Sequence, residues 1–184
     1  SDYHYEIGCA NGGIIGSIAE KFNNFDKAKF VGIDLSKHLI KEAKKRYKSI
    51  KNLNFVEHNA SKHNFKIINL AIIHYCLQFM PYNEKRVLLK LIYKKLLRKG
   101  AAIIFEKTLL EDSYSQEIFS GVYSDFKFEN GYSADEVVNK SISLRSVMQS
   151  SSSKDNIALF KEIGFNKIYT FFKWGPFEGY LCIK

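Results

Sequence analysis

The stretch Tyr-His-Tyr-Glu-Ile-Gly-Cys-Ala-Asn-Gly-Gly, residues 3–13, decides the fold of this chain. It begins with a short run of strand-forming residues, Tyr3–Ile7, and ends where a segment of helical periodicity, residues 12–22, begins. Between them, Gly8 and Gly12 let the backbone turn sharply and let another molecule approach it closely. The N–H groups at the start of the following helix favour polar or anionic groups. The stretch therefore predicts a strand–turn–helix unit that binds a ligand at its turn.

The rest of the chain continues the alternation of strand and helix. Apolar runs of strand length alternate with longer amphipathic segments, which is typical of a parallel sheet with helices on both faces. The predicted strands are 29–34, 54–57, 70–76 and 101–106, and the predicted helices are 37–48 and 83–97, the last ended by Gly100. A helix at 153–163 and an antiparallel terminal hairpin of strands 167–172 and 178–183 complete a single domain, residues 1–184, on a mostly parallel seven-stranded sheet.

The regular alternation lapses over about residues 108–152. Ser113–Phe126 and Ser133–Met148 have helical patterns and are joined by a turn, so we expect a helical insertion after the fifth strand. Insertions on rigid sheets often carry specificity. Its aromatic residues either wall a pocket for a ring-bearing substrate or pack the insertion onto the sheet; they are Tyr123, Phe126, Phe128 and Tyr132.

Composition and charge limit the class of protein. With 184 residues and 46% hydrophobic content, the chain can bury one sizeable core. Lysine and arginine number 28 against 19 acidic residues, a net charge of +9 that attracts polyanions. The lysine clusters within residues 41–48 and 94–99 either bind RNA or form solvated helix faces, where cations are favourable at helix ends.

Cysteine usage and hydropathy indicate the compartment. Cys9, Cys76 and Cys182 form no paired motif and have no histidine at ligand spacing, so we expect neither a metal site nor a disulfide framework. A reducing cytoplasm fits best. No run approaches the ~20 apolar residues of a membrane span, and the chain starts with no signal pattern, so we expect a soluble protein with no membrane partner.

Two acidic residues mark the first two strand ends. Asp34 closes Val31-Gly32-Ile33-Asp34, where a carboxylate can accept both hydroxyls of an adenosyl ribose. Glu6, just before the first glycine, resembles the acidic position that class I methyltransferases keep there. A glycine turn alone is also what an ordinary tight turn requires. Together with Asp34 and the βαβ order, it predicts a Rossmann-like class I methyltransferase fold that binds S-adenosylmethionine.

Two further strand ends carry polar candidates. Asn59 follows the third strand, where its amide can both donate to and accept from an adenine ring, although asparagine is also a common turn residue. His74, at the end of the fourth strand, is either a general base or a hydrogen-bonded structural residue.

From Leu77 onward, the chain resembles one family within this fold. The stretches that carry the resemblance are Leu77-Gln78-Phe79, Glu106-Lys107, Glu111-Asp112, Asp125-Phe126-Lys127, Asn130-Gly131-Tyr132-Ser133 and Val147-Met148. They are similar to those of carboxy-S-adenosyl-L-methionine synthases, and the similarity spans nearly the whole chain. The resemblance implies that prephenate carboxylates S-adenosylmethionine, with phenylpyruvate as the second product and carboxy-S-adenosylmethionine as a bound product. It also implies a homodimer, and a partner enzyme that uses the product to modify the wobble uridine of tRNA, so that tRNA is involved only indirectly.

The resemblance also assigns cofactor-binding residues. It places the glycine turn at Gly8, Cys9 and Ala10, the ribose-binding strand end at Asp34 and Leu35, and the adenine position at Asn59 and Ala60. The chain departs from the family at three positions: Asn59 replaces the usual Asp, His74 replaces an Asn near the sulfonium, and Ser141 replaces an Arg that pairs with the new carboxylate.

The loss of the arginine weakens the expected carboxylate site, because a hydroxyl gives at most one neutral hydrogen bond where a guanidinium gives a charged pair. Arg145 lies four residues beyond Ser141, on the same face of a regular helix, and Lys140 is adjacent. We therefore name Arg145, Lys140 and His74 as candidate catalytic residues.

Three functions fit these observations: a carboxylating synthase, a methyltransferase acting on a small molecule or tRNA, and a cofactor-binding protein whose catalytic residues have decayed. The residue at position 141, which is serine here, distinguishes the carboxylating synthase from the methyltransferase. Enzymes of this type have an N-terminal segment that covers the cofactor, and the sequence starts almost directly on the first strand, so we expect that segment to lie outside it.

Overall fold

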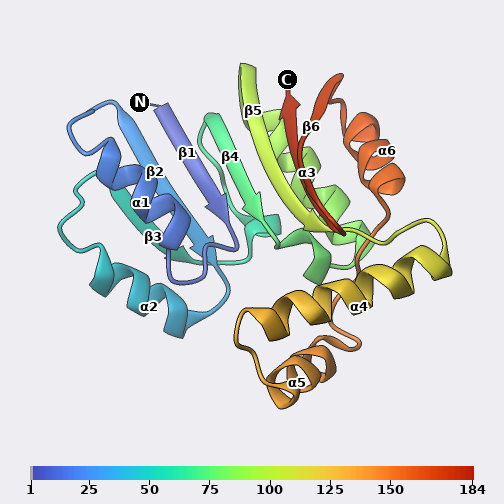
Figure 1. The fold of residues 1–184 in the computed structure, drawn as a ribbon. Coiled ribbons are helices and arrows are strands. Elements are labelled where there is room, and N and C mark those ends of the chain that lie inside the picture. Colours follow the sequence, from blue (N-terminus) through green and yellow to red (C-terminus); the bar gives the residue numbers. More distant parts are fainter. Residues whose placement is uncertain (1) are drawn as a thin grey trace.

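The computed structural model describes residues 2–184 and has one seven-stranded sheet, ordered β3-β2-β1-β4-β5-β7-β6 (Figure 1). The first five strands are mutually parallel, and β7 is antiparallel to both β5 and β6. This confirms the predicted fold class. The strands are β1 (Asp2–Ile7), β2 (Ala28–Asp34), β3 (Leu53–Glu57), β4 (Ile68–His74), β5 (Leu96–Lys107), β6 (Lys167–Trp174) and β7 (Phe177–Ile183).

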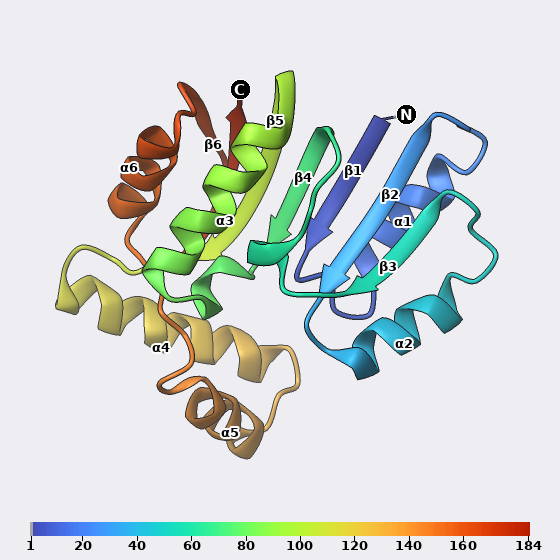
Figure 2. The same ribbon diagram turned by 180° about the vertical axis from the view of Figure 1, so that it is seen from behind.

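Helices cover both faces of the sheet, and each face has its own apolar cluster. On one face, α1 (Gly13–Lys21) and α2 (Lys37–Arg46) pack around Phe30 and Phe55. On the other face, α3 (Tyr82–Lys95) and α6 (Ser153–Ile163) cover the strands, as Figure 2 shows, and enclose the larger cluster. The central strands are buried on both sides by these layers, which explains their near-continuous apolar sequences.

The insertion lies off the carboxyl ends of the parallel strands. It consists of α4 (Ser113–Glu129), which crosses below β5 in Figure 1, and α5 (Ala134–Leu144), which packs on α4. No residue of either helix is fully buried. An isolated bridge between Leu109 and Ser152 brings the two ends of the insertion together at the sheet. The insertion is therefore attached to the domain at its base.

Several predicted helix ends are wrong: α2 ends at Arg46 instead of Lys48, and α4 continues to Glu129, past the predicted Phe126. The third main helix ends at Lys95, not at the predicted Leu97, because Leu96 is already extended and pairs with Ile68 as the first residue of β5. The second insertion helix ends at Leu144 instead of Met148. Beyond it, the chain returns to the 3₁₀ turn that follows β4, where the N–H of Gln149 donates to the backbone oxygen of Gln78 at 2.6 Å. The first end is set by pairing with the sheet, whereas the second lies five residues before the contact with this 3₁₀ turn.

Leu88→Ala should lower the free energy of unfolding by about 2–5 kcal/mol, because Leu88 is fully buried and its truncation leaves a cavity. Val87→Ala is the matched control on the same helix, since Val87 is 53% exposed, and it should change stability by less than about 0.5 kcal/mol. Urea unfolding followed by circular dichroism measures both. Equal losses in the two variants would contradict the assigned face of α3.

Candidate functional site

The carboxyl ends of β2, β1 and β4 form one row. Ile7 pairs with Ile33 on one side and with Ile73 on the other. The N–H of Gly8 also donates to the oxygen of Ile33 at 2.8 Å. Asp34 and His74, which follow these pairs, therefore flank the glycine turn. The strand order reverses direction at β1, and open α/β sheets bind ligands at such a point.

The turn after β1 requires glycine at two positions. Gly8 and Gly12 have φ values of +70° and +76°, which side-chain-bearing residues rarely adopt. A Cβ at Gly8 would lie 2.6 Å from the Sγ of Cys76, and one at Gly12 would lie 2.5 Å from the ring of Phe55. The turn is thus packed tightly on its inner side. Cys9 is buried in the same layer, and Ala10 also has a positive φ, 46°.

Glu6 supports the turn from below. Its side chain is buried, and Oε2 accepts a hydrogen bond from the N–H of Ile15 at 2.9 Å. Ile15 lies in the first turn of α1, whose capping residue Gly12 has no side chain to do this. Burial raises the pKa of Glu6 to about 7. The N–H groups of Gly13 and Ile14 have no intrahelical acceptor and remain for a ligand. Direct contact of Glu6 with the cofactor stays a prediction.

Asp34 ties the glycine turn to the end of β2. Its Oδ2 accepts from the N–H of Ala10 and its Oδ1 accepts from the N–H of Ser36, both at 2.8 Å. Each carboxylate oxygen can accept a second hydrogen bond. The half-buried carboxylate can therefore still accept from two ribose hydroxyls. The next residue, Leu35, is 72% exposed and offers an apolar surface beside it. These residues fit an adenosyl group.

Asn59 lies beside Asp34 on the third strand end. The N–H of His58 donates to the backbone oxygen of Asp34 at 3.0 Å, which fixes this proximity. The Oδ1 of Asn59 accepts from the N–H of Ser61 at 2.9 Å and caps a short 3₁₀ turn, η1 (Ala60–Lys62). Its amide nitrogen is left as a donor, so the turn role and the predicted adenine role are compatible.

His74 lies on the opposite side of the turn, among aromatic rings. Its ring centre is 4.4 Å from that of Tyr75 and 5.3 Å from that of Phe105. Burial lowers the pKa of the imidazole, so His74 is neutral at neutral pH. Cys76 is held beside Gly8, and burial raises the pKa of its thiol to about 12. Cys76 is therefore a protonated packing residue, whereas a neutral His74 can accept a proton.

A polar network joins the insertion to this edge. Gln78, in the 3₁₀ turn η2 (Leu77–Phe79), accepts from the N–H of Lys107 with its Oε1 at 2.8 Å. The returning end of the insertion is held by Lys85, whose Nζ donates to the oxygen of Gln149 at 2.7 Å. Glu106, buried below, accepts from the N–H of Leu77 at 3.1 Å. Burial raises the pKa of Glu106 to about 8, opposed by the nearby charge of Lys85.

In the described part of the chain, the structure shows no contact between the row and the three predicted residues of the second insertion helix and its C-cap. Lys140, Ser141 and Arg145 are exposed, and within residues 2–184 no hydrogen bond or ion pair joins their side chains to the sheet edge. Arg145 caps the end of α5 with extended backbone angles, φ −60° and ψ 137°. The chain leaves the helix directly after Arg145, so this residue stands at the end of the helix that carries Ser141. Their catalytic roles stay predictions.

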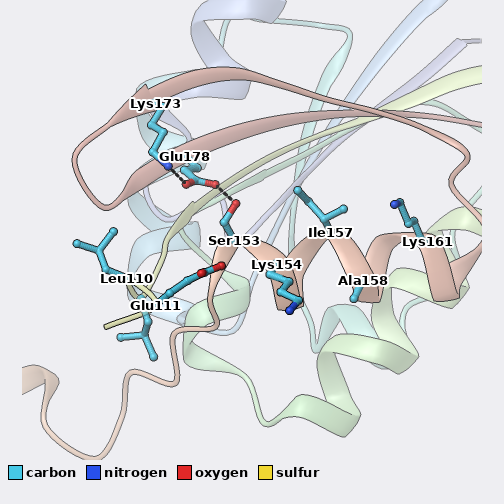
Figure 3. Close-up of a pocket in the computed structure, with 10 residues that line it drawn as sticks. Leu110, Glu111, Ser153, Lys154, Ile157, Ala158, Lys161, Lys173 and Glu178 are labelled. Carbon is cyan, nitrogen blue, oxygen red and sulfur yellow. Dashed lines mark hydrogen bonds and ion pairs between the residues drawn. The ribbon is translucent and has the colours of Figure 1, made fainter. Parts of the chain in front are cut away.

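A hollow of about 600 Å³ lies elsewhere, between α6, the β6–β7 hairpin and residues 109–111 (Figure 3). None of the predicted cofactor residues lines it. Glu178 at its inner wall is bound on both oxygens: Lys173 lies 2.8 Å from Oε1, and Ser153 donates to Oε2 at 2.7 Å. This cluster therefore stabilises the hairpin. In the part of the chain described, residues 2–184, no group of three or more potential ligands could hold a metal ion, and no helix is long and apolar enough to cross a membrane.

The sequence interpretation missed two lysines at this edge. Lys107 and Lys127 lie in stretches that carry the family resemblance, but neither was singled out. In the structure, both ammonium groups lie over the ring of Tyr123, at 5.4 Å and 4.0 Å from its centre. No sequence signal reports this, because the two lysines come from different elements and meet only through the fold.

Comparisons with known proteins agree with this geometry. A family model described as a methyltransferase domain matches residues 5–100. The carboxy-S-adenosyl-L-methionine synthase of Campylobacter jejuni subsp. doylei is 31% identical over 180 residues, covering 97% of this chain and 75% of that protein. The protein of the same name from Staphylococcus epidermidis is 31% identical over 182 residues, covering 98% and 78%.

Solved structures share the fold at low identity. The YcgJ protein of Bacillus subtilis superposes with a TM-score of 0.67 at 18% identity, covering 95% of this chain and 65% of that one. Human N-acetylserotonin methyltransferase, solved in complex with S-adenosylmethionine, gives a TM-score of 0.67 at 16% identity, covering 99% and 47%.

Asp34→Asn should weaken binding of S-adenosylhomocysteine by tenfold or more, because the amide nitrogen can no longer accept from Ala10 or from a ribose hydroxyl. Isothermal titration calorimetry measures the dissociation constant. Asp26→Asn, at an exposed position between α1 and β2, is the control and should leave it unchanged. Equal affinities in the two variants would remove Asp34 from the site.

Glu106→Gln should reduce the loss of stability that the protein suffers between about pH 5 and pH 8. The folded-state pKa of Glu106, about 8, lies above its ordinary 4.5, so its contribution is complete below the ordinary pKa and is lost as the pH rises through 8. Glutamine keeps an acceptor for Leu77 but does not ionise. Between pH 5 and pH 8, the free energy of unfolding measured with urea should fall by on the order of 1–3 kcal/mol less in the variant than in the parent. Parallel slopes would contradict the shift.

Proposed function

Because the chain belongs to the carboxy-S-adenosyl-L-methionine synthase family and contains its methyltransferase domain, we propose that it carboxylates S-adenosylmethionine with prephenate as the carboxyl donor. The carboxyl group moves from the prephenate ring to the sulfonium methyl carbon. Hydroxide leaves the ring and combines with the proton lost from the methyl group, so that phenylpyruvate and water are the other products. The observation that carries this proposal is the 31% identity to synthases over 97% of the chain.

In this proposal, each residue of the row binds a different part of S-adenosylmethionine. S-adenosylmethionine supplies an activated methyl group when bound. Asp34 accepts from the ribose hydroxyls, the first-turn N–H groups of α1 bind polar groups of the amino acid end, and Asn59 with Ala60 contacts the adenine. This arrangement directs the reacting end toward β4, where the rings of Tyr75 and Phe105 pack against His74.

A second candidate function is methyl transfer to a small molecule or to tRNA. His74 favours this function. Burial keeps its imidazole neutral, so that the ring can take a proton from a methyl acceptor. The replacement of the family's arginine by Ser141 also points to it, since Ser141 offers no charge for a carboxylate. Identity to the synthases over nearly the whole chain favours carboxylation over this alternative.

The product, carboxy-S-adenosylmethionine, serves a downstream transferase that modifies the wobble uridine of tRNA, and the chain itself need not bind RNA. Exposed apolar side chains on α4 and α5 support a homodimer formed through the insertion. These side chains are Tyr114, Ile118, Val122, Phe126, Val138 and Ile142. The free thiols of Cys9, Cys76 and Cys182 support a cytoplasmic location.

Incubation with S-adenosylmethionine and prephenate should yield a cofactor product heavier by one carbon dioxide, together with phenylpyruvate, detected by mass spectrometry. The Asp34→Asn variant is the matched control and should form at most a tenth of the product at subsaturating cofactor. Ser141→Arg, tested beside them, shows whether the missing guanidinium limits the reaction. If only the Ser141→Arg variant forms the carboxylated product, the natural chain is assigned as a methyltransferase. The same assignment follows if no form of the protein makes the product although it binds the cofactor.

A further inference from the structure

Two lysines from different elements meet over one aromatic ring at the carboxyl edge of the sheet. Lys107 is the last residue of β5, and Lys127 lies near the end of α4. Their Nζ atoms lie 5.4 Å and 4.0 Å from the ring centre of Tyr123, and the Nζ of Lys107 also lies 5.9 Å from that of Phe177. The two positive charges therefore lie around the same ring, which joins the end of β5 to α4.

Neither ammonium group has an oxygen partner within residues 2–184, although both side chains are half-buried. Other lysines removed from water in this protein do have one. The Nζ of Lys85 donates to the oxygen of Gln149, and that of Lys184 donates to the oxygen of Tyr93, both at 2.7 Å. A partly buried charge without such a partner is costly.

The charges also repel one another. Burial lowers the pKa of Lys107 and of Lys127, and the neighbouring Lys127 lowers that of Lys107 further, as Lys140 does that of Lys127. Contact with the face of an aromatic ring stabilises each cation by only about 0.5–1 kcal/mol at partly exposed sites. An arriving anion would relieve both the repulsion and the missing hydrogen bonds.

Aromatic contacts connect this lysine pair to the reaction centre. The ring of Tyr123 lies 5.1 Å from that of Phe177, which lies 5.7 Å from that of Tyr75. Tyr75 in turn contacts His74, with ring centres 4.4 Å apart. A flat ligand held by the lysines can therefore lie along an aromatic wall that leads to the end of β4. Rings along such a wall favour a ring-bearing ligand.

We propose that Lys107 and Lys127 bind the carboxylates of the second substrate, a ring-bearing dicarboxylate, against the wall of Tyr75, Tyr123 and Phe177. That this dicarboxylate is prephenate rests on the proposed function. That the ligand is an anion with two negative charges rests on the lysine pair. In this arrangement the lysines supply the positive charge that Ser141 cannot provide. They act as specificity-determining residues for the carboxyl donor and leave cofactor binding to the opposite side of the turn.

Lys107→Gln and Lys127→Gln should each raise KM for prephenate at least tenfold, because each removes one charged hydrogen bond to a carboxylate. Affinity for S-adenosylhomocysteine should stay within twofold of the parent. Lys107→Arg and Lys127→Arg should recover much of the loss, since charge and donors are retained. Lys154→Gln, an exposed lysine of α6 outside this region, is the matched control and should leave KM unchanged.

Direct titration separates this proposal from the proposed reaction. Calorimetry of prephenate into protein saturated with S-adenosylhomocysteine should show binding that is at least tenfold weaker in either Gln variant, whether or not turnover occurs. Binding with this lysine dependence but no carboxylated product would support the lysine site and reject the synthase reaction. If prephenate does not bind the parent, or binds both Gln variants as tightly while only their unfolding midpoints fall, the lysine proposal is overturned.

Discussion

The carboxylate of Asp34 holds the two backbone segments between which the ligand-binding edge forms. By accepting from Ala10 on the glycine turn and from Ser36 at the start of α2, it fixes the turn against the end of the second strand. The positive φ at Gly8 and Gly12 is possible only without side chains there, since Cys76 and Phe55 already fill the space. These contacts hold the turn in place between the strand ends. Asn59 and Asp34 lie on one side of it, and His74 lies on the other.

The second half of the site depends on the anchoring of the insertion. α4 and α5 bury no residue completely and cannot hold themselves in place by packing alone. Gln78 is the junction: its side chain accepts from Lys107, and its backbone oxygen accepts from Gln149 where the insertion returns. Since only Tyr75 and Cys76 separate η2 from the strand that ends in His74, the insertion is attached next to the end of β4. A change in this network would move the lysines and the aromatic wall together.

The net charge of this edge of the sheet differs from the value that a count of its acidic and basic residues gives. Burial raises the pKa of Glu6 to about 7 and that of Glu106 to about 8, so both are largely or partly protonated near neutral pH. Lys107 and Lys127 are less deeply buried. The protonation of the two carboxyl groups makes the edge more positive than its composition implies, which supports the proposed dicarboxylate substrate.

The sequence by itself determined the order of elements, the glycine turn and the acidic end of β2, because these depend on local periodicity and on backbone angles that only glycine adopts readily. It also determined the family, through stretches such as Leu77-Gln78-Phe79. The sequence could not determine where a helix ends when a distant strand pairs with the chain, as at Leu96, or that Gln149 returns to the 3₁₀ turn at Gln78. Nor could it show that Arg145 stands at the end of its helix, or that two lysines twenty residues apart meet over Tyr123. Only the tertiary structure decided these points, because they depend on contacts between residues far apart in the chain.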